Sequence, residues 1–348
     1  MTCSGSSKRS TTGRGTMPNR MLRTGLIGLG AMGRNHLRVL SELEGTQLVA
    51  VVDPQPVNVK TRASPTIVRS VEELVAKQLD YAVVACPTGL HHKVGLILAE
   101  AGVHALFEKP LADTVDAARD LTAAFQSRGL IAGVGHIERY NPALQNLRER
   151  LAAGSLGEVY QVVTRRQGPF PARIGDVGVV KDLATHDIDL TAWVTDQDYT
   201  SVAALTARKS GREHEDMVLV VAELTGSVMA NHIVNWLSPL KERSTIVTGE
   251  RGCFVVDTLT ADLSFYANGS VSTDWEAIRN FRGVSEGDVT RFAIARREPL
   301  LVEHERFRDA VAEGHQNGIV TAAAGLRTVE VSAAVLESAA TGRTVFTR

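Results

Sequence analysis

The chain has 348 residues, which is long for a single hydrophobic core and fits two domains. Its 38 Lys and Arg and 39 Asp and Glu leave a formal net charge of -1, so no overall field attracts nucleic acid or an anionic membrane. No apolar stretch is long enough to span a bilayer. The few, widely separated cysteines, Cys3, Cys86 and Cys253, argue against a disulfide framework and favour the reducing cytoplasm.

Residues 1–21 are rich in Ser, Thr, Gly and basic side chains and lack the apolar segment of a secretory signal. We expect a disordered tail there. A transit peptide is the alternative, because the segment is basic and contains no acids, but nothing in it is amphipathic. The first strand begins only near Leu22, so Met17 and Met21 are equally good candidates for the initiating residue.

A glycine-rich turn at residues 25–33 is the most informative segment. Gly28 permits a tight turn after a strand, Gly30 lets backbone approach a pyrophosphate, and Gly33 lets the next helix pack closely on the sheet. The first N–H groups of that helix, at Ala31 and Met32, then face the phosphates. This spacing predicts a dinucleotide-binding βαβ unit, against the alternative of a glycine turn in an unrelated α/β domain.

Asp53 follows an apolar run about 20 residues after the last glycine, where an acid binds the adenosine ribose hydroxyls. Its carboxylate would repel a 2′-phosphate. The next residue is Pro54, not a basic side chain that would pair with that phosphate. The cofactor predicted is therefore NAD, with NADP less favoured.

Alternating apolar runs and helical stretches predict a Rossmann domain with a parallel sheet over residues 22–142. The expected strands are Thr24–Gly28, Gln47–Val52, Tyr81–Ala85, Ala105–Phe107 and Ile131–Gly135, and the expected helices are Arg34–Leu43, Val71–Lys77, His92–Ala101 and Val115–Arg128. Ligands bind at the carboxyl ends of such strands, which is where Gly28, Asp53, Pro87, Thr88 and Lys109 fall.

Residues 143–348 predict an α/β domain with a large, mainly antiparallel open sheet. The expected strands are Gly157–Arg166, Ser201–Lys209, Met217–Leu224, Ser227–Leu237, Ser244–Gly249, Gly252–Thr258 and Asp262–Ala267, and the expected helices are Ala143–Ala153, Val302–Glu313 and Thr321–Ala340. Thr225-Gly226 and Asn268-Gly269 are typical of hairpin turns. The free face of such a sheet is a common route to dimers.

Two groups of residues carry possible chemistry. Lys109, at the end of an apolar strand, would project into the crevice and stabilise a developing alkoxide, although a solvated surface lysine is the common alternative. If residues 181–190 are helical, Asp182 and His186 share a face. The imidazole would then act as a general base, with Asp182 orienting it or the substrate. A helix cap is the alternative for Asp182.

Three motifs together resemble the Gfo/Idh/MocA family of NAD(P)-dependent oxidoreductases: Gly28-x-Gly30-x-x-Gly33, Glu108-Lys109-Pro110 and Asp182-x-x-x-His186-x-x-Asp189. The resemblance covers about residues 22 to 348. It implies that Lys109, Asp182 and His186 are catalytic. The Lys-Pro bond of this motif is often cis in the family, so we expect a cis bond before Pro110. It also implies that Pro87, Thr88, His91, Glu108 and Lys109 line the cofactor groove. A homodimer or homotetramer through the open sheet is expected.

Shorter strings at residues 135–142, 165–171 and 176–180 resemble enzymes that oxidise the 3-hydroxyl of UDP-N-acetylglucosamine or of its uronic acid. The resemblance implies a sugar-nucleotide substrate that contacts Asp182 and His186 and also Tyr140, Asn141, Arg165 and Arg166. A near-neutral chain needs local cations for a diphosphate, and Arg165, Arg166 and Arg173 lie near the catalytic segment. Charges on a sheet surface are an equally good interpretation of these arginines. Lys181 stands where many relatives have an apolar residue.

Other interpretations remain open at this stage. Cys86, His91 and His92 could suggest a metal, but no second ligand cluster accompanies them, so we expect none. His136 and Glu138 either touch substrate or connect the domains. A different sugar or a cyclitol is the nearest alternative substrate, and a dinucleotide-binding regulator without turnover is the alternative class.

Overall fold

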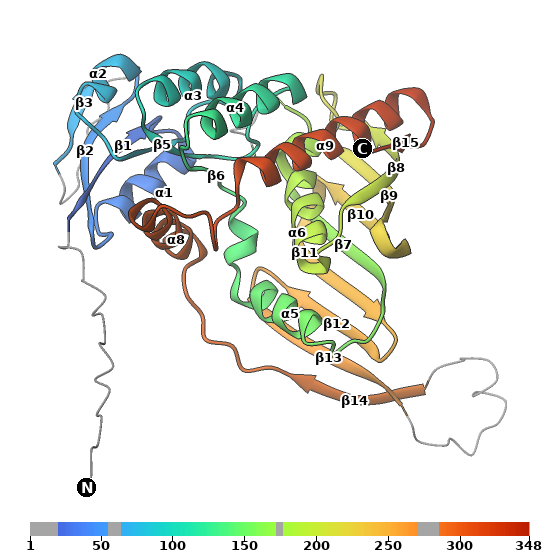
Figure 1. The fold of residues 1–348 in the computed structure, drawn as a ribbon. Helices are drawn as coiled ribbons and strands as arrows, with labels where there is room; N and C mark the ends of the chain where they lie inside the picture. Colours follow the sequence, from blue (N-terminus) through green and yellow to red (C-terminus); the bar gives the residue numbers. More distant parts are fainter. Residues whose placement is uncertain (1–19, 55–63, 172–176, 270–284, 348) are drawn as a thin grey trace, which may run out of the picture.

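The computed structural model describes residues 20–54, 64–171, 177–269 and 285–347. They form two sheets with helices around them (Figure 1). The expected tail, apart from residues 20 and 21, and Arg173 lie outside the described residues.

The first sheet has six parallel strands in the order β3-β2-β1-β4-β5-β6. Its strands are β1 (Leu22–Ile27), β2 (Thr46–Val52), β3 (Thr66–Val68), β4 (Tyr81–Val84), β5 (His104–Phe107) and β6 (Ala132–Val134). All four residues of β4 are buried, as expected for a strand covered on both faces. The strand order reverses at β1, so the turns after β1 and β4 face the same crevice, where ligands of such sheets bind.

Helices cover both faces of this sheet (Figure 1). The helices α2 (Val71–Val75), α3 (His91–Glu100) and α4 (Val115–Ser127) lie on one face, and α1 (Ala31–Leu40) lies on the other. Short local signals fix where some of them begin. The Thr114 hydroxyl, for example, accepts a hydrogen bond from the N–H of Ala117 at the start of α4. The prediction of a Rossmann domain is confirmed.

The second sheet has nine strands in the order β14-β13-β12-β11-β7-β10-β9-β8-β15. They are β7 (Val159–Pro169), β8 (Tyr199–Ala207), β9 (Met217–Leu224), β10 (Met229–Asn235), β11 (Leu237–Gly249), β12 (Gly252–Asp257), β13 (Asp262–Gly269), β14 (Ser285–Arg291) and β15 (Val345–Phe346). Only the β7–β10 pair among these is parallel. The prediction of a mainly antiparallel sheet is therefore confirmed.

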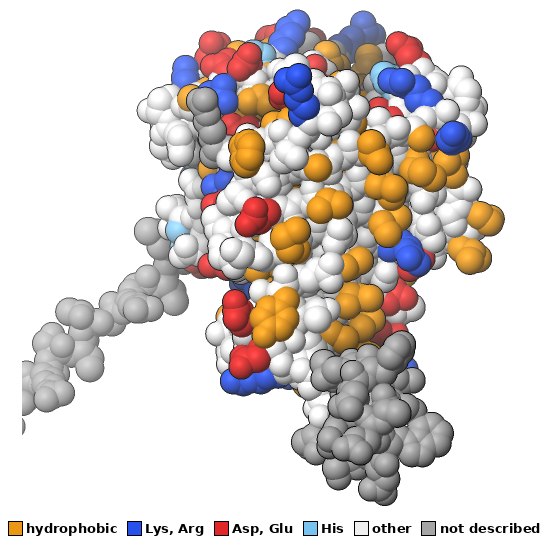
Figure 2. Space-filling model, turned by 90° about the vertical axis from the view of Figure 1, so that its right-hand side faces the viewer, with side chains coloured by type: hydrophobic (Ala, Val, Ile, Leu, Met, Phe, Trp, Pro, Cys, Tyr) orange, Lys and Arg blue, Asp and Glu red, His pale blue; other side chains and the backbone are white. Residues whose placement is uncertain are grey.

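One face of the second sheet is covered by α5 (Pro142–Ala152), α6 (Thr185–Thr195) and α9 (Ala322–Thr341) (Figure 1). Among the described residues, no helix covers the opposite face. Strand β9 shows the contrast, because Val218 and Val220 are buried while Leu219 and Val221 between them are exposed. Figure 2 shows hydrophobic side chains spread over the side of the molecule that lies at the right of Figure 1.

Several expected boundaries are wrong. Asn268 and Gly269 form no turn, because they continue β13 and pair with Glu286 and Ser285 of β14. Strands β3, β14 and β15 were not predicted from the sequence. Strand β11 begins at Leu237, whereas the expected strand began at Ser244. These segments gain order from pairing with a neighbouring strand, which local composition does not encode. The turn at Thr225-Gly226 is confirmed between β9 and β10, with Gly226 at φ 72.

The C-terminal helices also connect the two halves of the chain. Helix α8 (Pro299–Glu313) packs on the first sheet, where the Phe307 ring meets the Tyr81 ring edge-on at 5.3 Å between centroids. The first turns of α9 pack there too, through Ala322 and Ala324. The expected boundary at residue 142 therefore marks where the second domain starts. The first domain, however, is completed by residues near the end of the chain.

Candidate active site

The glycine turn after β1 fits a dinucleotide. Gly28 has φ 94, a conformation that side chains disfavour. A Cβ at Gly33 would lie 2.0 Å from the Gly28 carbonyl oxygen, whereas a Cβ at Gly30 would meet nothing within 4 Å. Helix α1 begins at Ala31 without a side-chain cap, so its first N–H groups, including that of Met32, are available to a phosphate. The surface over Gly30 is thus open for close approach by a pyrophosphate.

Asp53 follows β2 and turns toward this loop. One of its carboxylate oxygens accepts a hydrogen bond of 2.7 Å from the backbone N–H of Leu29. The contact places an acid beside the glycine turn, at the position where an adenosine ribose would be bound.

The segment after β4 lies opposite the glycine turn. Pro87 is exposed and Thr88 is partly exposed, and they lead into a short 3-10 turn. His91, by contrast, is buried, and its ring nitrogens lie 3.0 to 3.3 Å from the carbonyl oxygens of Cys86, Pro110 and Leu111. The expectation that His91 lines the cofactor groove is therefore corrected. Its ring connects the loop after β4 to the loop after β5.

Glu108 is held by a residue that the sequence analysis did not single out. Its carboxylate lies 2.9 Å from the ring of buried His36 in α1, and its other oxygen accepts a bond of 3.1 Å from the backbone N–H of Lys109. Burial raises the pKa of Glu108, but the His36 hydrogen bond and the nearby cations outweigh it and lower the pKa overall. The carboxylate thus fixes the backbone that carries Lys109.

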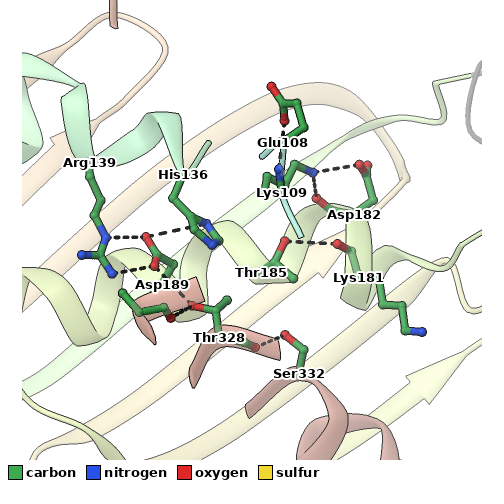
Figure 3. A network of polar contacts seen from close by, with 11 residues as sticks. Glu108, Lys109, His136, Arg139, Lys181, Asp182, Thr185, Asp189, Thr328 and Ser332 are labelled. Atoms are coloured by element: carbon green, nitrogen blue, oxygen red, sulfur yellow. Dashed lines mark hydrogen bonds and ion pairs between the residues drawn. The ribbon is translucent and has the colours of Figure 1, made fainter. Parts of the chain in front are cut away.

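The side chain of Lys109, a residue of the first domain, contacts the second domain. Its ammonium donates to the Asp182 carbonyl oxygen at 2.6 Å and to the Asp182 carboxylate at 3.1 Å (Figure 3). The peptide bond between Lys109 and Pro110 is cis, as the resemblance implies. Both side chains are largely buried, so this contact brings together two residues that are far apart in sequence.

His186 lies one turn after Asp182. Residues Val180–Ala184 form a π-helical turn that runs directly into α6, and such turns are frequent at functional sites. The Nδ1 atom of His186 is enclosed without a hydrogen-bond partner among the described residues. Burial, and then the positive charges of Lys109, Arg166 and Arg243, hold the pKa of His186 well below its usual range. The imidazole is therefore neutral near pH 7 and able to accept a proton.

A second ion pair supports the same helix. Arg139 donates two hydrogen bonds to Asp189, at 2.8 and 2.7 Å, and Thr328 of α9 donates a third at 3.2 Å (Figure 3). His136 packs at 3.8 Å from the same carboxylate. Burial lowers the pKa of His136 to about 4. Lys181 points away from this network and donates to the carbonyl oxygen of Asp113 at 3.0 Å.

The predicted contacts of substrate with the two neighbouring arginines need correction. Successive residues of a strand point to opposite faces, so Arg165 and Arg166 of β7 cannot both face the site. Arg165 is exposed and pairs with Glu242. Arg166 is buried under α6, where it donates to Asp187 at 2.9 Å and to Glu138 at 2.8 Å. Neither guanidinium is available to a diphosphate in this structure.

Tyr140 and Asn141 are likewise structural. Both are buried, and the Asn141 side chain accepts a bond from the N–H of Ala143 at the start of α5 and donates to the Thr258 carbonyl. Tyr140 lies in the core of the first domain. The motif at residues 135–142 therefore connects the domains, and the expected substrate contacts of these two side chains are corrected.

Over the described ranges, no set of three or more His, Cys, Asp or Glu side chains is placed to hold a metal ion. None of the helices in the same part of the chain has the length and apolar character needed to cross a membrane.

Fold and site define a dinucleotide-binding oxidoreductase. A family model described as an oxidoreductase family with an NAD-binding Rossmann fold matches residues 22–136, and a Gfo/Idh/MocA C-terminal domain model matches residues 144–255. Together these models cover most of the described chain. The protein belongs to the Gfo/Idh/MocA family of oxidoreductases, as the sequence motifs indicated.

Relatives of the chain include two kinds of dehydrogenase. The UDP-N-acetylglucosamine 3-dehydrogenase of Acidithiobacillus ferrooxidans is 29% identical over 84% of this chain and 89% of its own length. A solved structure of that enzyme has a TM-score of 0.76 and 27% identity, covering 91% of this chain and 97% of the other. Inositol 2-dehydrogenase 2 of Saccharopolyspora erythraea is 27% identical over 93% of this chain and 94% of its own length.

A solved structure of lower sequence identity has the same fold. The WlbA dehydrogenase of Bordetella pertussis, solved with NADH and UDP-GlcNAcA, has a TM-score of 0.79 at 21% identity and covers 96% of this chain and 99% of its own. The family model and the two relatives that match most of the chain identify it as a dehydrogenase acting on a CH–OH group, with an NAD-binding Rossmann domain.

The Arg166→Met variant should lose about 3–5 kcal/mol of unfolding free energy, because it leaves the Glu138 and Asp187 carboxylates buried without their cation. Arg165→Met, which removes an exposed charge from the adjacent position, should cost less than about 1 kcal/mol. Urea unfolding followed by circular dichroism measures both. Equal losses in the two variants would contradict the assignment of the buried pair.

Proposed function

We propose that the protein oxidises a ring hydroxyl, at C3, of a nucleotide-linked N-acetylhexosamine to a keto sugar, with NAD as the oxidant. The observation that carries this proposal is the contact of Lys109, at the carboxyl end of the first sheet, with Asp182, which lies one helical turn before His186. The similarity to UDP-N-acetylglucosamine 3-dehydrogenase supports the substrate class. The product would be a 3-keto sugar.

The residues divide the reaction between them. NAD, held over Gly28, Gly30 and Gly33, supplies the hydride acceptor when bound. The neutral imidazole of His186 takes the hydroxyl proton as the hydrogen on the carbinol carbon leaves as hydride, with the electron pair of the C–H bond, for the acceptor. The Lys109 ammonium stabilises the negative charge on the substrate oxygen until the carbonyl forms. Asp182 holds that ammonium in place through two hydrogen bonds.

Another sugar or a cyclitol is the second candidate, because inositol dehydrogenases are among the relatives that match most of the chain. The same three side chains would perform that chemistry on any ring carbinol. A regulator without turnover is disfavoured, because all three are present and Lys109 contacts Asp182.

A panel of candidate substrates tests the function. We expect reduced coenzyme to accumulate with UDP-N-acetylglucosamine or its uronic acid and not with myo-inositol or UDP-glucose, as measured by absorbance. Lys109→Ala should lower kcat at least about a hundredfold, while NAD affinity measured by calorimetry stays within about twofold. Absence of turnover with every UDP-hexosamine would reject the substrate, and an unchanged kcat in the variant would reject the mechanism.

Preference for NAD over NADP is also part of the proposal, and it rests on Asp53 beside the Leu29 N–H. Asp53→Asn keeps an oxygen acceptor for that N–H and removes the negative charge. The ratio of kcat/KM for NAD to that for NADP should fall by about tenfold, or about 1.4 kcal/mol. Steady-state kinetics with both coenzymes measures the ratio, and an unchanged ratio would show that another residue discriminates.

We further propose that the protein works in the cytoplasm as a homodimer or homotetramer formed through the open face of the second sheet. Cys86 and Cys253 are free thiols, as expected for a reducing compartment. The open face exposes Leu205, Leu219 and Val221, and exposed apolar surface of this kind marks contact sites.

Light scattering coupled to size exclusion tests the assembly. We expect a mass two or four times that of the chain, and a shift to monomer for Leu219→Asp. Leu90→Asp, which changes an exposed leucine on the first domain, should leave the mass unchanged. A monomeric wild-type protein would refute the proposed oligomer.

A further inference from the structure

Arg243 is a cation that has no partner among the described residues. Its side chain is partly buried in β11, and among the described residues it makes no hydrogen bond or ion pair. Partly buried arginines are normally bound to an anion, because removing a guanidinium from water without a partner costs free energy. The side chain therefore has unused binding capacity.

The sheet register places Arg243 on the side of the catalytic helix. Arg243 is paired directly with Arg166 across β11 and β7, and directly opposed residues lie on the same face of a sheet. The Arg166 guanidinium reaches Asp187 of α6. Arg243 therefore lies on the helix-covered face that carries His186, whereas Arg165 points to the open face.

Neighbouring charges show that Arg243 is close to the reacting groups. Its positive charge lowers the pKa of His186 and is itself attracted by Asp182, Glu138 and Asp187. Burial, followed by repulsion from Arg166, lowers the pKa of Arg243. Two arginines side by side are unfavourable, and Glu138 and Asp187 are already bound by Arg166. A further anion at this point would relieve the repulsion.

The other cations around the site already have partners. Lys109 binds Asp182, Arg139 binds Asp189, and Lys181 binds a carbonyl oxygen of the first domain. Among the cations just described, Arg243 is the one left to meet a negative charge on a ligand. A guanidinium suits this task, because it presents paired N–H groups to two oxygens of one anion.

We propose that Arg243 binds an anionic group of the sugar substrate while His186 faces the hydroxyl that is oxidised. The inference rests on the proposed function and deepens it, because it requires a substrate with an oxyanion near the reacting ring. Two groups have this chemistry, the diphosphate attached to the sugar and the carboxylate of a uronic acid. The experiment below distinguishes them.

The test compares Arg243→Gln and Arg243→Lys with the matched control Arg165→Gln. Arg165 belongs to the neighbouring strand but lies on the opposite face and pairs with Glu242. With the uronic acid of UDP-N-acetylglucosamine, which carries both candidate anions, Arg243→Gln should lower kcat/KM about ten- to a hundredfold, mostly through KM. Arg243→Lys should lose less, and Arg165→Gln should stay within about twofold. Unchanged NAD affinity and circular dichroism show that the variants are folded.

The two anions give different patterns. If Arg243 binds the diphosphate, both substrates lose equally in Arg243→Gln. If it binds the carboxylate, the loss is confined to the uronic acid. A loss in kcat alone, with a shifted pH profile and an unchanged KM, would mean that Arg243 affects only the pKa of His186 and does not bind the substrate. This outcome would overturn the proposal.

Binding measurements separate this inference from the proposed function. Calorimetry with NADH present, so that the glycine turn is filled, uses inorganic pyrophosphate for the diphosphate and glucuronate for the carboxylate. Wild-type protein should bind at least one probe, and Arg243→Gln should not, even if no UDP-hexosamine is oxidised. Binding of neither probe by the wild type, or equal binding by Arg243→Gln, would overturn the role of Arg243 whatever the substrate proves to be.

Discussion

The contact between the Lys109 ammonium and Asp182 is the interaction on which the site depends. It joins a loop of the parallel sheet to the helix of the second domain at 2.6 and 3.1 Å. A lysine side chain has many rotamers, and two acceptors on one residue restrict them. The amine is therefore positioned before any ligand arrives, and its charge is in place to act on His186. Such preorganisation is the main source of electrostatic catalysis.

Buried ion pairs hold helix α6 in its place between the sheet and the connection of the two domains. Arg139 and Glu138 come from the connection between the domains, and each binds a partner at the helix or the sheet beneath it. Their bonds replace the hydration lost on burial, so breaking one leaves an uncompensated charge. These ion pairs thus hold the helix in place, while burial, followed by the positive charges of Lys109, Arg166 and Arg243, keeps the His186 imidazole neutral.

The sequence was sufficient for features encoded by local spacing. The glycine turn and Asp53 were predicted correctly as neighbours, because one strand and one turn determine where they lie. The family resemblance assigned Lys109, Asp182 and His186 to one site, and the structure places the Lys109 ammonium against Asp182. The predictions failed where packing between distant segments determines the direction of a side chain or the presence of a strand. Adjacent arginines of β7 point to opposite faces, and strands β14 and β15 exist only through their partners. The roles of His36 and Arg243 depend on contacts that no single segment of the chain reveals.

The return of α8 to the first sheet has a consequence for how the chain is made. Phe307 fills the space beside Tyr81 in the core of the first domain, and the two residues are more than half the chain apart. A ribosome that has finished the first six strands has therefore produced a domain that still lacks one covering helix. The part of the face beside α1 stays uncovered until the last part of the polypeptide emerges, so this fold reaches its final form only after synthesis is nearly complete.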